Sequence, residues 1–211
     1  MKKVLAVLGV AVLIGCSSAY YNTMEKIGIH KRDIMVDRVE EARDSQKDAE
    51  KQFTSALEQF KSVVAVDGGN IEPIYKKLNK EYEESKAAAQ EIRDRIDSVE
   101  SVSKALFKEW EEELKQYSSA QLRNESQRKL TATKAQYQRL ITAMRKTESR
   151  LDPVLTAMND QVLYLKHNLN ARAIQSMRQE VVKIDKDVDV LLAAMRTSIA
   201  EAEAFIKEIK D

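Results

Sequence analysis

Few residues of this chain are of types that do chemistry, and their spacing gives them little chance to act together. The sequence has two histidines, His30 and His167, and a single cysteine, Cys16. The histidines fall in different predicted helices, near opposite ends if helices alternate in direction, which argues against a shared metal site. Carboxylates are plentiful, as in Glu40-Glu41, but adjacent residues do not face each other on a helix. We therefore expect no metal, no cofactor and no enzymatic activity.

Cys16 stands at the end of a segment with the parts of a secretory signal. A basic start is followed by an apolar run over residues 4–14, and Gly15 precedes the cysteine. These are the n-region, the h-region and the small residue before the cut. The run is shorter than the ~20 residues that a membrane-spanning helix needs. The final LIGC, residues 13–16, resembles a bacterial lipoprotein signal, in which cleavage after the glycine leaves a lipidated cysteine as the first residue.

This interpretation fixes an expected location. Residues 1–15 would be the signal peptide, Cys16 the lipid-bearing residue and residues 16–24 a short tether to the membrane. The residue after the cysteine influences sorting in lipoproteins of this kind, and Ser17 replaces the Asp that retains them at the inner membrane. We expect an outer-membrane protein that faces the periplasm. The formal charge of +1 gives no electrostatic case for nucleic-acid binding.

The rest of the chain predicts long helices. The sequence has five glycines and two prolines, and helix-favouring residues dominate it. Apolar or small residues recur at steps of three and four over residues 35–63, 78–110, 122–169 and 174–209. This pattern is typical of amphipathic helices that pack at shallow angles. Trp110 falls on the second of these seams, where it packs in the core or contacts the membrane end.

Three breaks divide these stretches. Asp67 to Asn70 is a strong turn, with Pro73 in the first turn of the next helix. Ser118 has capping-box spacing to Gln121. The third turn has two candidate positions, Asp152-Pro153 or residues 168–170. The apolar phase continues across the proline as far as Leu169, which favours the later position.

These breaks predict an all-α fold, a long antiparallel four-helix bundle over residues 25–211. The helices are expected at about 25–66, 71–117, 119–167 and 171–209, and their similar lengths favour an up-down-up-down arrangement with short turns. The alternative is a pair of long hairpins that complete their core only by dimerising. The sequence leaves the oligomeric state open.

The turns far from the predicted anchor form a candidate partner-binding tip, because loops carry function more often than their scaffold does. Ordinary turn chemistry also explains the asparagines and glycines there. The residues of this tip are Asp67, Asn70, His167, Asn168, Asn170 and Arg172.

Several segments resemble a known family. They are YNTMEKIG at 21–28, KRD at 31–33, VLYLKHNLNA at 162–171, and SIAEA at 198–202 with Phe205-Ile206. They are similar to a family of uncharacterised Gram-negative envelope lipoproteins, classed as a domain of unknown function. The resemblance covers nearly all of the mature chain and implies a lipoprotein with a helical body. It supplies no activity, substrate or catalytic residue.

Two functional hypotheses follow. The first is a non-enzymatic, lipid-anchored bundle with a structural or adaptor role, held to the membrane through Cys16 and bound to another envelope protein. The alternative is a binding module that holds an apolar ligand or an envelope protein in a groove between helices. Seam methionines, which adapt to varied partners, motivate this alternative; they are Met144, Met158, Met177 and Met195.

Overall fold

The structure, a computed structural model, describes residues 30–64, 71–169 and 171–210. They form four helices: α2 (Lys31–Val63), α3 (Glu72–Leu114), α4 (Ala120–His167) and α5 (Ala171–Lys210). No strand occurs among these residues. The all-α prediction is confirmed.

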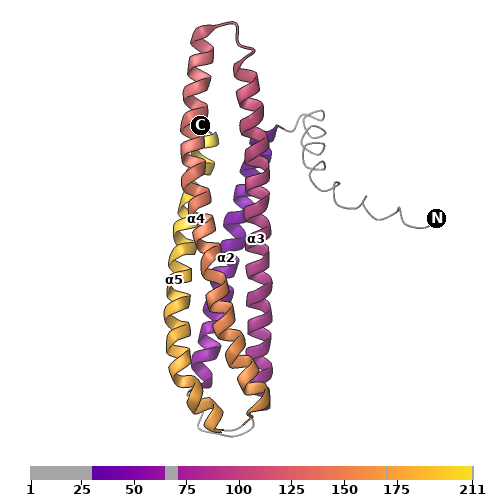
Figure 1. Ribbon diagram of the computed structural model, residues 1–211, viewed down its shortest axis with the longest axis vertical. Coiled ribbons are helices and arrows are strands. Elements are labelled where there is room, and N and C mark those ends of the chain that lie inside the picture. The colour runs from indigo at the N-terminus through magenta and orange to yellow at the C-terminus, as the bar shows by residue number, and fades with distance from the viewer. Residues whose placement is uncertain (1–29, 65–70, 170, 211) are drawn as a thin grey trace, which may run out of the picture.

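The four helices lie side by side and alternate in direction (Figure 1). α2 packs against α3 and α5, and α4 packs against the same two helices. This is the up-down-up-down arrangement of an antiparallel four-helix bundle, as the sequence predicts. Because the core closes within one chain, a dimer is not needed to complete it.

The core follows the predicted apolar seams of all four helices. Large side chains such as Phe53, Phe60 and Phe205 are fully buried, and small ones such as Ala42 and Ala56 alternate with them on α2. Two seam assignments are wrong. Leu122 lies near the start of α4, in the hairpin that extends past α2 and α5, and Leu169 follows the end of α4; both are exposed.

The polar residues predicted on the seam are buried with the apolar ones. Ser103 and Thr147 donate hydrogen bonds to backbone oxygens one turn earlier, those of Glu100 and Ala143. Gln46 differs, because neither its amide nitrogen nor its amide oxygen has a hydrogen-bond partner among the described residues. A buried polar group without a partner costs stability, so Gln46 is a weak point of the core.

The helices differ in length, and this corrects the prediction of similar lengths. α2 has 33 residues, whereas α3 has 43 and α4 has 48. As a result, α3 and α4 continue past the start of α2 and the end of α5 as a two-helix hairpin (Figure 1). We call this the hairpin end of the bundle. The far end holds the end of α2, the start of α3, the end of α4 and the start of α5.

The observed helix ends refine the predicted ones. α4 continues through Pro153 to His167, so the third turn lies at the later of its two candidate positions. Ser119, rather than Ser118, caps α4 and accepts a hydrogen bond from the backbone nitrogen of Leu122 at 3.4 Å. α2 begins at Lys31 after an extended His30. Residues 25–29 of the predicted first helix and the turn at 67–70 lie outside the described residues.

Arg145 is the centre of an ion-pair cluster between two helices. From α4 it reaches Asp97 at 2.8 Å and Glu100 at 3.0 Å on α3, and Glu148 at 2.7 Å on its own helix. The hydrogen bond with Glu100, followed by that with Glu148, raises the pKa of its guanidinium above the ordinary value. The cluster therefore ties the middle of α4 to α3 through charge.

We expect Arg145→Met to lower the free energy of unfolding by about 1 kcal/mol, because the partly exposed ion pairs are screened by solvent. Urea denaturation followed by circular dichroism measures this change, which should shrink in 1 M salt as screening increases. Lys51→Met is the matched control, since Lys51 makes a single exposed pair with Asp48. An equal loss in both variants would contradict a special role for the cluster.

Candidate functional site

The structure leaves part of the predicted site outside its described residues. The signal segment, Gly15, Cys16 and the tether all precede residue 30. Of the candidate tip, Asp67, Asn70 and Asn170 also lie outside. The two histidines are described, and they lie at opposite ends of the bundle, as predicted: His30 precedes α2, and His167 is the last residue of α4.

The far end brings His167, Asn168 and Arg172 near the turn between α4 and α5. His167 and Arg172 are exposed. The side-chain amide of Asn168 donates to the backbone oxygen of Tyr164 at 2.9 Å, and its backbone nitrogen donates to Leu165 at 3.1 Å. Asn168 thus closes the end of α4, which is turn chemistry, while its two neighbours remain available to a partner.

Exposed apolar residues at the far end were missed by sequence reasoning. Leu163, Tyr164 and Leu169 are 47%, 40% and 46% exposed. Leu163 and Tyr164 sit between the buried seam residues Val162 and Leu165, so their off-seam position was the available signal. Exposed large apolar residues near one end of a polar rod are a feature of interaction surfaces.

The base of the hairpin contains a pocket of about 270 Å³ where all four helices meet. Leu106, Trp110 and Ile209 form its apolar part. Nζ of the buried Lys31 lies 2.8 Å from Oε1 of Glu109 at its edge. The pocket also has residues His30, Arg32, Glu113, Lys129 and Thr133 in its lining.

Trp110 occupies an intermediate position between the two roles considered for it. Its indole is partly buried at the pocket, and Nε1 donates to Oγ of Ser126 at 2.8 Å across the hairpin. The side chain therefore joins α3 to α4 just where the four-helix core gives way to the two-helix hairpin. It is a packing residue at the edge of the core.

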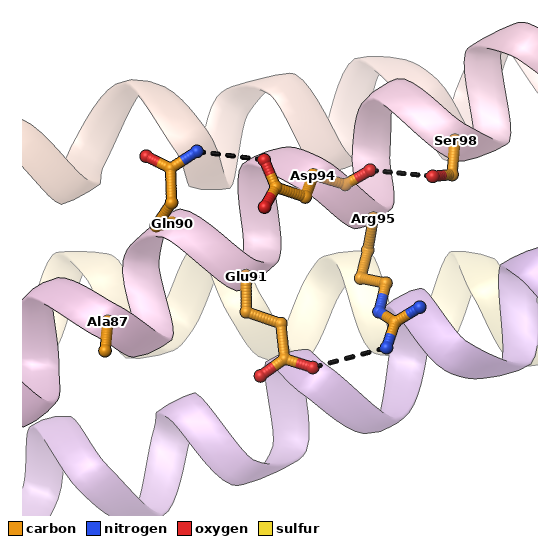
Figure 2. Close-up of a pocket in the computed structure, with 6 residues that line it drawn as sticks. All are labelled: Ala87, Gln90, Glu91, Asp94, Arg95 and Ser98. Atoms are coloured by element: carbon orange, nitrogen blue, oxygen red, sulfur yellow. Dashed lines mark hydrogen bonds and ion pairs between the residues drawn. The ribbon is translucent and has the colours of Figure 1, made fainter.

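A second hollow, of about 480 Å³, lies along α3 and is lined by residues of that helix alone (Figure 2). Its polar groups already have partners. Gln90 donates to Asp94 at 2.9 Å, and Arg95 reaches Glu91 at 3.5 Å and Glu41 of α2 at 2.8 Å. These contacts satisfy the charged groups of the hollow locally.

Every pKa shift found among the described residues leads away from neutral pH. Burial raises the pKa of the Tyr137 hydroxyl, and a hydrogen bond with Ser103 offsets part of that effect. The hydrogen bond from Arg43 lowers the pKa of Asp44, and the one with Asp48 raises that of Lys51. A general acid or base works best with a pKa near the operating pH. The pKa shifts of Asp44 and Lys51 come from ion pairs on the surface, and that of Tyr137 comes from burial.

Comparison with known sequences adds a family. The profile of DUF2959, described as a protein of unknown function, matches residues 20–209. The chain belongs to the DUF2959 family. The match covers all four helices, so the bundle and its hairpin make up the DUF2959 domain, while Cys16 precedes the matched residues. The resemblance to a family of unknown function is thereby confirmed. No curated protein matches the chain.

Two further properties of this DUF2959 chain concern the described residues alone. None of their helices combines the length and the apolar character needed to cross a bilayer. They also contain no group of three or more His, Cys, Asp or Glu side chains that could hold a metal ion.

Proposed function

We propose that this protein is a lipoprotein of the Gram-negative outer membrane, anchored through Cys16, whose helical body has a structural or adaptor role in the periplasm. The LIGC segment at residues 13–16, after an apolar run that follows a basic start, is the observation that carries the anchor. The chain's lone cysteine has no disulfide partner, and lipidation gives it a use.

A non-enzymatic role is supported by the chemistry of the body. Many of its titratable groups form ion pairs, and the hollow on α3 holds polar groups that bond one another. A bundle about 70 Å long, from the 1.5 Å rise per residue over α4, separates its two ends well. That shape suits a protein that holds a partner at a distance from the membrane.

The far end is the proposed partner-binding surface. It combines exposed His167 and Arg172 with the exposed apolar side chains of Leu163, Tyr164 and Leu169. Mixed apolar and charged surface is what a protein partner of moderate affinity buries. The expected partner is another envelope protein.

The groove-binding alternative stays a prediction. The seam methionines that motivate it, Met144, Met158, Met177 and Met195, are fully buried between the helices. An apolar ligand would reach them only if the helices separated. The ends of the bundle offer exposed surface without that cost, so the adaptor role is the better supported of the two.

Replacing Cys16 with serine tests the anchor. We expect Cys16→Ser to abolish incorporation of labelled palmitate and to leave unprocessed precursor in the inner membrane, because the acceptor thiol is gone. Ser18→Ala is the matched control and should be labelled and processed normally. Palmitate incorporation into Cys16→Ser would contradict the proposal.

A third variant tests the destination. Ser17→Asp keeps the cysteine but supplies the residue that retains lipoproteins of this kind at the inner membrane. We expect normal labelling together with a shift from outer-membrane to inner-membrane fractions on a sucrose gradient. An unchanged distribution would refute sorting through this position.

A further inference from the structure

We propose that the hairpin tip, residues 115–129, is a second membrane contact that docks on an anionic phospholipid bilayer. The tip comprises the turn after α3 and the first turns of α4. None of its side chains is buried, whereas Leu114 and Leu130 on either side of it are. The first ten residues of α4, about three helical turns, therefore project beyond the core and place no buried side chain in it.

The tip presents apolar side chains to solvent. Tyr117 is 39% and Leu122 is 53% exposed, and they lie on opposite sides of the α3–α4 turn. Tyrosine is favoured at membrane–water interfaces, where its ring meets the headgroups and its hydroxyl stays wet. An exposed leucine such as Leu122 can enter the boundary between headgroups and acyl chains.

The charge of the tip complements an anionic surface. Its acidic residue is Glu125, and its basic residues are Lys115, Arg123, Arg128 and Lys129. Arg123 and Arg128 form no ion pair with any described residue. The acidic residues at the end of α3 are partly neutralised, because Glu111 pairs with Lys134 and Glu112 with Lys115. Basic residues near an anionic leaflet are attracted to it.

The position of the tip agrees with its composition. Lys129 of α4 and Lys31 at the start of α2 line the same pocket and so lie at a similar level. From that level the segment Ala120–Lys129 extends about 15 Å further, at the helix rise of 1.5 Å per residue. The chain between Cys16 and His30 spans at most about 50 Å even when fully extended. A bilayer that lies across the hairpin end of the bundle therefore meets the hairpin tip before any other described part.

A bilayer fits this surface better than a protein partner does. The tip presents two exposed large apolar side chains, against three at the far end, and a narrow hairpin offers little of the roughly 1,000 Å² that a specific protein interface buries. Peripheral attachment to lipid needs less, because a few apolar and basic groups add to a tether that already holds the body near the surface. The inference rests on the proposed anchor in one respect: the anchor decides which end of the bundle faces the membrane.

Fluorescence quenching tests the contact. The chain 17–211, with a hexahistidine tag in place of Cys16, is bound to phosphatidylglycerol-containing vesicles through a nickel-chelating lipid. Trp110 is the sole tryptophan, so Trp110→Phe provides a dark background for Leu122→Trp at the tip. We expect brominated phospholipids to quench this probe. Leu163→Trp, at a similarly exposed leucine of the far end, is the control and should not be quenched.

A second arm measures charge. For the same chain without the nickel lipid, Arg123→Glu with Arg128→Glu should lower partitioning into anionic vesicles by about 25-fold or more, at about fivefold for each basic residue lost. Lys166→Glu with Arg172→Glu makes the same change of net charge at the far end. This control should leave the partitioning nearly unchanged.

The outcomes separate this inference from the anchor. Absence of quenching at the tip of tethered protein, or equal quenching at both probes, would overturn the inference even if Cys16 is lipidated in cells. Quenching confined to the tip supports it even if Cys16→Ser shows that no lipid is attached, because the tag supplies the tether. An equal loss of partitioning in both charge variants would also overturn it.

Discussion

Phe53→Ala is expected to lower the free energy of unfolding by about 3–5 kcal/mol, the usual cost of truncating a buried phenylalanine. Phe53 is fully buried in the shared core from its position on α2. Removal of the ring loses buried apolar surface and leaves a cavity. The long helices could close this cavity only by shifting against their neighbours. The seam near it already contains small residues such as Ala49 and Ala56, so few side chains can move in to fill the space.

Urea denaturation followed by circular dichroism at 222 nm measures this change, together with a fall in Tm of roughly 10 °C for a domain of this size. Phe107→Ala is the matched control. Phe107 is only partly buried and meets Tyr137 edge-on, with ring centroids 5.4 Å apart. We expect it to cost less than half as much. Equal losses would mean that the hairpin base is as tightly packed as the centre of the bundle.

Gln46→Leu should instead raise the free energy of unfolding. Gln46 is fully buried on α2, and its amide has no hydrogen-bond partner among the described residues. Leucine has a similar size and removes the unsatisfied polar atoms. We expect a gain of about 1–3 kcal/mol, the range of the desolvation penalty for such a group.

The matched control is Gln136→Leu on α4. Gln136 is also buried, but its side-chain oxygen accepts a hydrogen bond from Arg139. The same substitution there breaks a bond and should bring no gain. A loss of stability in Gln46→Leu would contradict the prediction and indicate that a buried water satisfies the amide, since polar cavities commonly hold one.

The sequence predicts the fold well because heptad spacing is a direct record of which side of each helix is buried. The apolar spacing continues through Val154 and Met158, which correctly predicted that α4 extends past Pro153. Relative length was harder to predict. Leu122 repeats the seam spacing, yet it is exposed because α2 and α5 stop short of it. Where a helix loses its neighbours depends on the register between helices, which no single helix encodes.

The candidate site was predicted less completely. The sequence singled out His167 and Arg172 through the turn they flank, and both are exposed at the far end. It missed Leu163 and Tyr164, because whether apolar residues beside a seam are covered depends on where the neighbouring helices lie. The pocket at the hairpin base joins Lys31, Trp110 and Ile209 from three helices, and only the packed bundle brings them together.

The four described helices return the chain to the side on which α2 begins. Lys210 of α5 pairs with Glu40 near the start of α2 at 2.9 Å, so the end of α5 lies near the hairpin end. A fluorescent protein or affinity tag fused after the last residue would therefore report on the surroundings of the hairpin. A label that reports on the far end must instead be inserted in the α4–α5 connection. There it would block access to the proposed partner-binding surface.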